Sequence, residues 1–468
     1  MRDALATIAT RFGLAVLIFG TDIALARLLG PAAKGRFALV LLYSQLAALI
    51  VGWGTDQALA VVSGRDSATA RHGFANALVW TAIVGGAAVI GSVWLFGIPG
   101  EGPATGPLAA LIPNLSGTQF MFAAVAVPGE LFFGLGLFAL LGRKRVLPYN
   151  LTRVVRRAVL LLMVLAVAAL ARLSLDVVLV LNLVALVISA AMILWVAATD
   201  GIVGGSPSRV LLAEELRFGS KALPGSLAER LQFRADSFLI NIILGVRQTG
   251  VYSVTSGLAE TLWYVPNALG TVMFSRAVDP QADAGRVASV LTRTTLAVAL
   301  ATAVPAFILG PRLVRAVYGT QFADAGVALR LILPGIVAYS VVAVLSRYIT
   351  GRGRPGMGTV ILVSGLAVNI AINLVLIPRY GIAGAAAASS VSYLVTAILT
   401  LAVFVRLSGR GLVETLVIRR SDLVALRGAL RAIVGRIEGT RVGPLVGLRG
   451  GDIAASQIID ELEPGEEL

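Results

Sequence analysis

Long apolar stretches, repeated along almost the whole chain, limit what this sequence can fold into. About 20 consecutive apolar residues cross a bilayer core of roughly 30 Å. Twelve such stretches lie at residues 9–29, 37–62, 74–97, 116–141, 152–171, 176–198, 221–244, 250–275, 288–310, 328–350, 357–377 and 382–405. Leu, Val, Ala and Ile dominate them and Gly is scattered through them, as is typical of helices that pack closely in lipid. The sequence therefore predicts an all-α polytopic membrane protein with about 12 transmembrane helices.

The composition argues against other classes of protein. Charged residues make up 14% of the chain and hydrophobic residues 57%, which leaves too little polar surface for soluble domains and too much apolar surface for disorder. Because the chain has no cysteine and a single histidine, His72, it cannot form disulfides, a Cys- or multi-His-ligated metal site, or a Ser-His-Asp triad in the membrane interior. We expect no catalytic residues, no metal and no cofactor.

The distribution of Lys and Arg predicts the orientation, because cytoplasmic segments carry an excess of them. With the N-terminus inside, the predicted cytoplasmic segments hold most of these residues, including Arg143–Arg145 and Arg153, Arg156 and Arg157. Both termini are then cytoplasmic. This bias, together with attraction to anionic membrane lipids, accounts for the net charge of +14 without a nucleic-acid partner.

A polar segment at 199–220 divides six predicted spans from six. It predicts an N-lobe at 1–200, an inter-lobe linker at 201–220, a C-lobe at 221–405 and a cytoplasmic tail at 406–468. The pattern L-G-x4-G-x-aromatic occurs between the first and second spans of each half, at 29–37 and 244–252. Two unrelated tight turns are one interpretation, since Gly is common at helix ends. The shared position favours a duplicated six-helix unit, a parallel repeat with a cleft between its two lobes.

The seventh predicted span carries unusual polar residues. At 3.6 residues per turn, one stripe is formed by Ser226, Arg230, Arg234, Ser237 and Asn241, with Glu229, Gln232 and Asp236 beside it. A charge at mid-bilayer costs at least about 2.5–3.5 kcal/mol, so such residues usually face a cavity or a partner. No acid and base here are three or four residues apart, so ion-pair partners would come from Asp22, Asp56, Glu130 or Glu260. Interhelical salt bridges that only hold the lobe together remain the alternative, above all for Glu229 and Asp236.

Other polar residues in the spans are further candidates. Arg11 and Asp22 fall on one helix face, and Gln45 lies mid-span. Glu130 follows Pro128-Gly129, where a kink could serve a cation site or only shape the packing. The cluster Arg153, Arg156 and Arg157 forms a basic cytoplasmic entrance, suited to phosphate contacts or explained by orientation alone.

Three stretches resemble a known superfamily. They are LARLLGPAAKGRFAL at 25–39, LQFRADSFLINIILGVRQTGVYSVTSGLAETLWYVPNALGTVMF at 231–274 and LIPRYGIAGAAAASSVSY at 376–393. These strings are similar to the multidrug/oligosaccharidyl-lipid/polysaccharide (MOP) exporter superfamily, in its polysaccharide-flippase branch. The resemblance implies two six-helix lobes in a V around a central cationic cavity. It also implies transfer of an undecaprenyl-pyrophosphate-linked oligosaccharide to the outer leaflet of the bacterial cytoplasmic membrane, alongside glycan polymerase or export machinery.

The physical chemistry fits that implication. Sugar hydroxyls and a pyrophosphate cannot enter hydrocarbon without replacement of their hydration. The expected cavity residues are Arg230, Arg234, Ser237, Asn241, Arg11 and Gln45. No bond is made or broken, so the chain is predicted not to be an enzyme. Without a Walker A loop, the expected energy source is a proton or Na⁺ gradient acting through Asp22, Glu130, Asp236 or Glu260.

Other functions fit less well. An ion-coupled multidrug antiporter of the same superfamily is the closest alternative, but it favours carboxylates and aromatics over two arginines. A membrane-embedded glycan polymerase or ligase needs a large outer loop, which the sequence lacks. The tail predicts an amphipathic helix over 423–437, capped by Ser421-Asp422, that lies on the membrane or docks a partner helix, followed by an acidic end.

Overall fold

The computed structural model describes residues 2–97, 99–263, 266–267, 269–270, 273, 276–277, 283–419 and 422 of the chain, with side chains from Gly13 onward except Leu111. Over these residues the structure is helical, and its only β-type pairing is an isolated bridge between Pro103 and Ser116. The predicted all-α class is confirmed.

The helices of the first half begin close to the predicted spans. They are α1 (Arg2–Gly52), α2 (Thr55–Ser63), α3 (Ser67–Trp80), a π-helical turn η1 (Thr81–Gly85), α4 (Gly86–Phe96), α5 (Gly117–Gly142), α6 (Val146–Leu170) and α7 (Leu175–Thr199). The second half contains α8 (Arg209–Gln232), α9 (Ala235–Leu244), α10 (Val246–Thr261), α12 (Ala284–Tyr318), α13 (Ala323–Gly351), α14 (Pro355–Ser408) and α15 (Leu412–Leu416). Within the described residues, seven helical segments are long and apolar enough to cross a membrane. This is a multi-pass membrane protein.

Two of the seven segments contain a reversal of direction at one glycine. In α1 the ammonium of Lys34 lies 2.7 Å from the carboxylate of Asp22, although twelve residues of straight helix would span about 18 Å. The arms of α1 therefore fold back at Gly30, whose φ is 74°. In α14 the reversal is at Gly381, and Asn369 on one arm donates to Ser389 on the other. Both hairpins match pairs of predicted spans, while the total of twelve spans remains a prediction.

The two repeated sequence patterns have the same turn. Gly30 has φ 74° and ψ 175°, and Gly245 has φ 85° and ψ 176°. A positive φ costs a glycine little and other residues much more, which explains the glycine at this position of the pattern. The second glycines of the pattern, Gly35 and Gly250, lie against each other: a Cβ on Gly250 would fall 1.8 Å from the carbonyl oxygen of Pro31. We call this part of the molecule the hairpin end.

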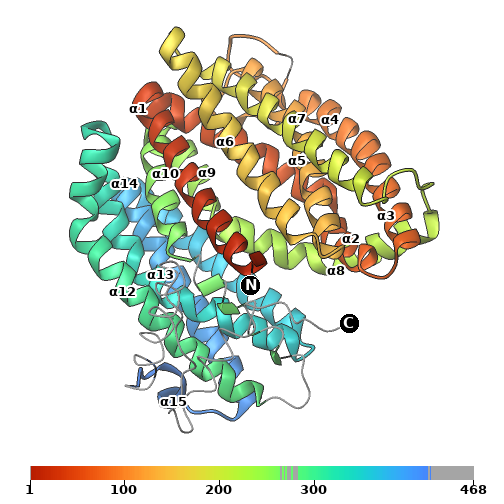
Figure 1. Ribbon diagram of the computed structural model, residues 1–468. Helices are drawn as coiled ribbons and strands as arrows, with labels where there is room; N and C mark the ends of the chain where they lie inside the picture. The colour runs from red at the N-terminus through yellow and green to blue at the C-terminus, as the bar shows by residue number, and fades with distance from the viewer. Residues whose placement is uncertain are drawn as a thin grey trace.

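The helices form two bundles inclined to each other (Figure 1). In the first bundle α5 packs against α1, α2, α4 and α7 around Phe74, Phe132 and Leu135. In the second, α13 packs between α12 and α14 around Tyr252, Phe322 and Ile336. Helices α1 and α10 pack on each other where the bundles meet.

The seventh span was predicted as one continuous helix, but the structure shows a break in it. Helix α8 ends at Gln232 and α9 begins at Ala235, so the chain turns at Phe233 and Arg234. The ring of Phe233 is held in the second bundle by Trp263, Tyr339 and Tyr393, with centroid distances of 4.5, 5.2 and 5.8 Å. The start of α8 is instead bound to the first bundle, so α8 crosses from one bundle to the other (Figure 1). A straight continuation of α8 into α9 could not satisfy both attachments.

The first half of α8 lies within the predicted linker 201–220. It packs on α2 and α3. The contact is close because Gly219 of α8 lies against Gly54, the residue before α2. A Cβ on Gly219 would lie 2.1 Å from the carbonyl oxygen of Trp53, the neighbour of Gly54. The second half packs on α14, where the amide of Gln232 donates to Thr396 at 2.7 Å.

The described part of the tail packs on the second bundle. Arg293 of α12 is buried, and its guanidinium donates to both carboxylate oxygens of Asp422 and to the carbonyl of Glu414. Arg410 binds Asp283 at the start of α12. We call residues 409–419 and Asp422 the tail strap. Asp422, predicted as a helix cap, is thus the ion-pair partner of a buried arginine; the helix predicted over 423–437 lies outside the described residues.

Candidate functional site

A cavity of about 820 Å³ lies where the bundles meet, lined by residues of α1, α2, α5, α6, α8, α9 and α10. Its basic lining residues are Lys34, Arg153, Arg156, Arg157, Arg230 and Arg234. Its acidic lining residues are Asp22, Asp56, Glu130, Glu229 and Glu260. The cationic cavity implied by the family resemblance is thus lined by six bases and five acids, and three of the bases, Lys34, Arg156 and Arg234, form ion pairs with lining acids.

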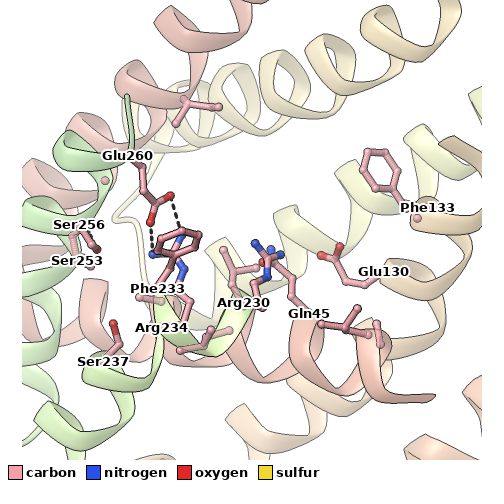
Figure 2. Close-up of a pocket in the computed structure, with 18 of the residues that line it drawn as sticks. Gln45, Glu130, Phe133, Arg230, Phe233, Arg234, Ser237, Ser253, Ser256 and Glu260 are labelled. Carbon is pink, nitrogen blue, oxygen red and sulfur yellow. Dashed lines mark hydrogen bonds and ion pairs between the residues drawn. The ribbon is translucent and has the colours of Figure 1, made fainter. Parts of the chain in front are cut away.

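Arg234 is fixed at the break between α8 and α9 and forms an ion pair with α10. Its Nη1 lies 2.8 Å from Oε1 of Glu260, and its Nη2 donates to Oε2 at 2.9 Å (Figure 2). This two-point geometry is the strong form of an arginine–carboxylate contact. Glu260 is one of the four acids predicted as partners on other helices. The pair is partly exposed to the cavity, with 27% and 33% of the two side chains accessible.

Arg230 lies one turn earlier, near the end of α8. Its Nη2 donates to Oε1 of Gln45 on α1 at 3.0 Å, a contact between the bundles. Figure 2 shows it between Arg234 and Glu130. Its direct hydrogen-bond partner is thus a neutral amide, whereas Arg234 is matched by a carboxylate. Arg230 therefore has the greater capacity to take up an additional anion.

Glu130 and Arg156 form a buried pair between α5 and α6. Both terminal guanidinium nitrogens of Arg156, Nη1 and Nη2, donate to the carboxylate of Glu130. Only 10% of the Arg156 side chain and 7% of the Glu130 side chain are accessible. The ring of Phe133 lies 4.5 Å from the guanidinium carbon. Arg156 is therefore buried and not exposed at an entrance, because Glu130 compensates its charge. Arg153 and Arg157 line the cavity as well, on the same helix.

Asp22 and Lys34 lie at the hairpin end of the cavity. The ammonium of Lys34 contacts Asp22 and donates to Ser253 of α10, each at 2.7 Å, and only 4% of the lysine side chain is accessible. Lys34 was not predicted as a site residue. Its position inside the repeated pattern, one residue before Gly35, was the signal that could have identified it.

Asp236 lies inside the second bundle and does not line the cavity. It is 1% accessible and accepts hydrogen bonds from the hydroxyl of Tyr252, from Ser389 at 3.1 Å and from the backbone nitrogen of Ser237 at 2.8 Å. Asn369 extends this network from Ser389. Among the described side chains no ion pair compensates this carboxylate. No cluster of three or more His, Cys, Asp or Glu residues that could hold a metal occurs in the described part of the chain.

Of the remaining predicted cavity residues, two line the cavity and one does not. Ser237 and Gln45 line the cavity. Asn241 does not: it is fully buried at the end of α9, and its amide donates to the carbonyl of Pro113 in the loop before α5, at 2.8 Å. The break at Phe233 and Arg234 rotates α9 out of the stripe that a straight helix would form. The side chain of Arg11 lies outside the described residues.

Two helical bundles with a charged, polar cavity between them are the arrangement expected of a membrane transport protein, because charged side chains inside a membrane usually face a cavity or a partner. Comparisons with known proteins agree. The profile of the family described as "Polysaccharide biosynthesis protein" matches residues 144–326. The probable low-salt glycan biosynthesis flippase Agl15 of Haloferax volcanii is 26% identical over 179 residues, which cover 35% of this chain and 36% of that protein.

Two solved structures share the fold. The lipid II flippase MurJ, in an inward closed conformation, superposes with a TM-score of 0.70 at 12% identity, covering 97% of this chain and 95% of the other. An inward-facing multidrug resistance transporter of the MATE family and MOP superfamily superposes with a TM-score of 0.67 at 16% identity, covering 87% and 98%. The chain has the MOP exporter fold, and the resemblance predicted from its sequence is confirmed.

Proposed function

We propose that this protein flips an undecaprenyl-pyrophosphate-linked oligosaccharide across the bacterial cytoplasmic membrane, for surface polysaccharide biosynthesis. The observation that carries the proposal is the cavity between the bundles, which is lined by Arg230 and Arg234 near the end of α8 and by Arg153 and Arg157 of α6. Arginine suits phosphate groups because its planar fork donates two parallel hydrogen bonds. The matched biosynthesis family and the named glycan flippase support a glycan as cargo.

The head group and the lipid tail of such a substrate need different surroundings. The polar lining of the cavity replaces the water that sugars and pyrophosphate lose, while the prenyl chain stays in lipid between the bundles. Rocking of the bundles then exposes the cavity to either side in turn, and no covalent bond changes. In this proposal both termini are cytoplasmic, the hairpin end faces outward, and polymerase or export machinery receives the glycan there.

A proton or Na⁺ gradient drives the cycle in this proposal, and Asp236 is the strongest of the four coupling candidates. The other three line the cavity, and each has a basic partner: Asp22 has Lys34, Glu130 has Arg156 and Glu260 has Arg234. Asp236 is buried and is held by hydroxyl and backbone donors alone. A carboxylate in such a site favours either a proton or a cation.

The test is glycan export in a strain that depends on this protein. Arg230→Ala and Arg234→Ala should each abolish surface polysaccharide while the protein is still inserted at normal levels. Arg234→Lys should restore little, because an ammonium keeps the charge but loses the fork. Arg247→Ala is the matched control, since this arginine is exposed in the hairpin after Gly245 and does not line the cavity.

Unchanged surface polysaccharide in both arginine variants would refute the assigned role. Loss of drug resistance with intact polysaccharide would instead identify a multidrug antiporter.

A further inference from the structure

A carboxylate outside the main cavity is buried without a charged partner. Glu215 lies in the first half of α8, is 3% accessible and faces α3. Its Oε2 accepts one hydrogen bond, from the amide of Asn76 at 3.3 Å. Its Oε1 is buried and, in the described structure, has no hydrogen-bond partner. An ionised carboxylate needs several donors to replace its hydration, so this site suits the neutral acid better.

Asn76 connects this acid to the chain before α8. Its Oδ1 accepts from the backbone nitrogen of Ser208 at 2.9 Å, and its Nδ2 donates to the carbonyl of Ser208 at 3.1 Å. One side chain of the first bundle therefore binds both the start of α8 and the buried acid. The protonation state of Glu215 therefore affects how firmly α8 is attached to the first bundle, both through Asn76 and through direct packing.

The charged groups around Glu215 are engaged elsewhere. Glu214 is adjacent on α8 and forms a two-point pair with Arg65 at the surface. On α3, Arg71 donates to the carbonyl of Gly201, and the ring of His72 contacts the carbonyl of Ser206. On α2, Asp56 lines the main cavity. None of these groups pairs with Glu215.

Burial raises the pKa of Glu215 from 4.5 to about 7, and the negative charge of Glu214 adds to this, while the hydrogen bond from Asn76 opposes it. Glu215 lies outside the seven apolar segments. The hollow beside it, lined by Thr55, Leu59 and Trp80 among others, has a volume of about 10 Å³. That is room for a single water at most, and it is too small for an organic ligand.

We propose that Glu215 is a proton-binding site that fastens the first half of α8 to the first bundle when it is protonated and loosens it when it ionises. This site goes beyond the function proposed above, because it does not involve the cavity or any of the four coupling candidates. Its location is the physical reason for the effect: α8 is attached to both bundles, so weakening one attachment changes how freely the bundles move relative to each other.

The direction with pH follows from linkage. The docked state binds the proton more tightly than an undocked, solvated glutamate, so docking is strongest at low pH. It weakens as the pH rises above 4.5, and the weakening is complete above pH 7. Between pH 6 and 8 the ratio of undocked to docked α8 should rise roughly tenfold.

The experiment uses the full chain in lipid nanodiscs. Because the native sequence has no cysteine, Ala68→Cys near the start of α3 and Ala213→Cys on α8, both exposed, allow two spin labels whose separation is measured from pH 5.5 to 8.5. The native chain should show one short distance at low pH and a growing longer population through pH 7. Glu215→Gln should keep the short distance at every pH.

Two matched controls separate Glu215 from its neighbours. Glu214→Gln and His72→Gln should both keep the pH dependence, although histidines as a class exchange protons in this range. The proposal is overturned if Glu215→Gln follows the native curve, if the native distance does not change, or if His72→Gln abolishes the change. Should Glu215→Gln fail to fold, Glu215→Leu replaces it: without a titratable group at this position the short distance must persist at every pH, and a curve like that of the native chain overturns the proposal.

Discussion

Gly35 and Gly250, which occupy the same position in the two repeated hairpins, pack directly against each other. A Cβ on Gly35 would lie 1.9 Å from the carbonyl oxygen of Val246, and one on Gly250 would lie 1.8 Å from that of Pro31. Each hairpin therefore fits into the other in the same way, as two copies of one unit do around a pseudo-twofold axis. The contact joins the bundles at the hairpin end.

Gly35→Ala should force the bundles apart at this end, because the obstructing atom belongs to the backbone and cannot rotate away. In a Ser253→Cys background, the rate of modification by a polar thiol reagent should rise severalfold, and export should fall. Gly86→Ala is the control, since a Cβ there meets nothing within 4 Å. An unaltered modification rate in Gly35→Ala would show that the contact does not close this end.

Breaking the buried pair of Glu130 and Arg156 should destabilise the first bundle. Glu130→Ala leaves a guanidinium that is 10% accessible without its acid, a change that typically costs about 3–5 kcal/mol. Thermal unfolding of the detergent-purified protein should shift to lower temperature. The double variant Glu130→Gln with Arg156→Gln should recover part of the loss, and Arg65→Ala, at an exposed pair, should change little. Equal melting of Glu130→Ala and the native protein would contradict this prediction.

The tail strap should be needed for a stable second bundle. In the pair of Arg293 and Asp422, 5% of each side chain is accessible. Asp422→Ala, or truncation after Ser408, leaves Arg293 buried and unpaired, at a cost of about 3–5 kcal/mol. The yield of monodisperse protein in size-exclusion chromatography should fall. Glu414→Ala, which removes only a partly exposed side-chain partner of Arg410 and leaves Arg293 paired with Asp422, should behave like the native chain. Normal yield after truncation would mean that the strap is dispensable.

Asp236→Asn should leave folding and membrane insertion intact but abolish the dependence of export on the ion gradient. The amide keeps the size and one acceptor oxygen but loses the charge, so the protein should insert at native levels. Export should lose its dependence on the proton or Na⁺ gradient and fall by at least tenfold. Asn241→Asp, buried in the same helix but outside this network, tests whether any buried charge change has the same effect. Gradient-dependent export by Asp236→Asn would exclude this residue as the coupling site.

The all-α membrane class could be predicted from the sequence because lipid imposes strong rules. Apolar length predicted the helical spans, and the glycine pattern at 29–37 and 244–252 predicted two hairpins whose turns prove to have the same backbone angles. Such features are local: each depends on a few neighbouring residues and on the absence of water in the bilayer.

The details of the site depended on tertiary contacts that the sequence does not display. Neither Gly nor Pro marks the turn at Phe233 and Arg234; the aromatic contacts of Phe233 with residues distant in the sequence hold it there. The predicted polar stripe therefore does not continue to Asn241, which lies beyond the break and away from the cavity. Glu215 was passed over because it lies in a polar segment, where a glutamate is ordinarily solvated, and only the packing of α8 on α3 shows that it is buried.

The pairing of Arg234 with Glu260 has a consequence for turnover. A cavity with uncompensated positive charge would hold a pyrophosphate so strongly that the ligand could not leave, and the transporter would stall. In the cycle proposed above, an arriving dianion would displace Glu260 from the guanidinium of Arg234, and the carboxylate would return when the cargo departs. Under that proposal, the carboxylates already paired with the arginines would keep the free-energy difference between loaded and empty states small, so that the cargo could be bound on one face of the membrane and released on the other.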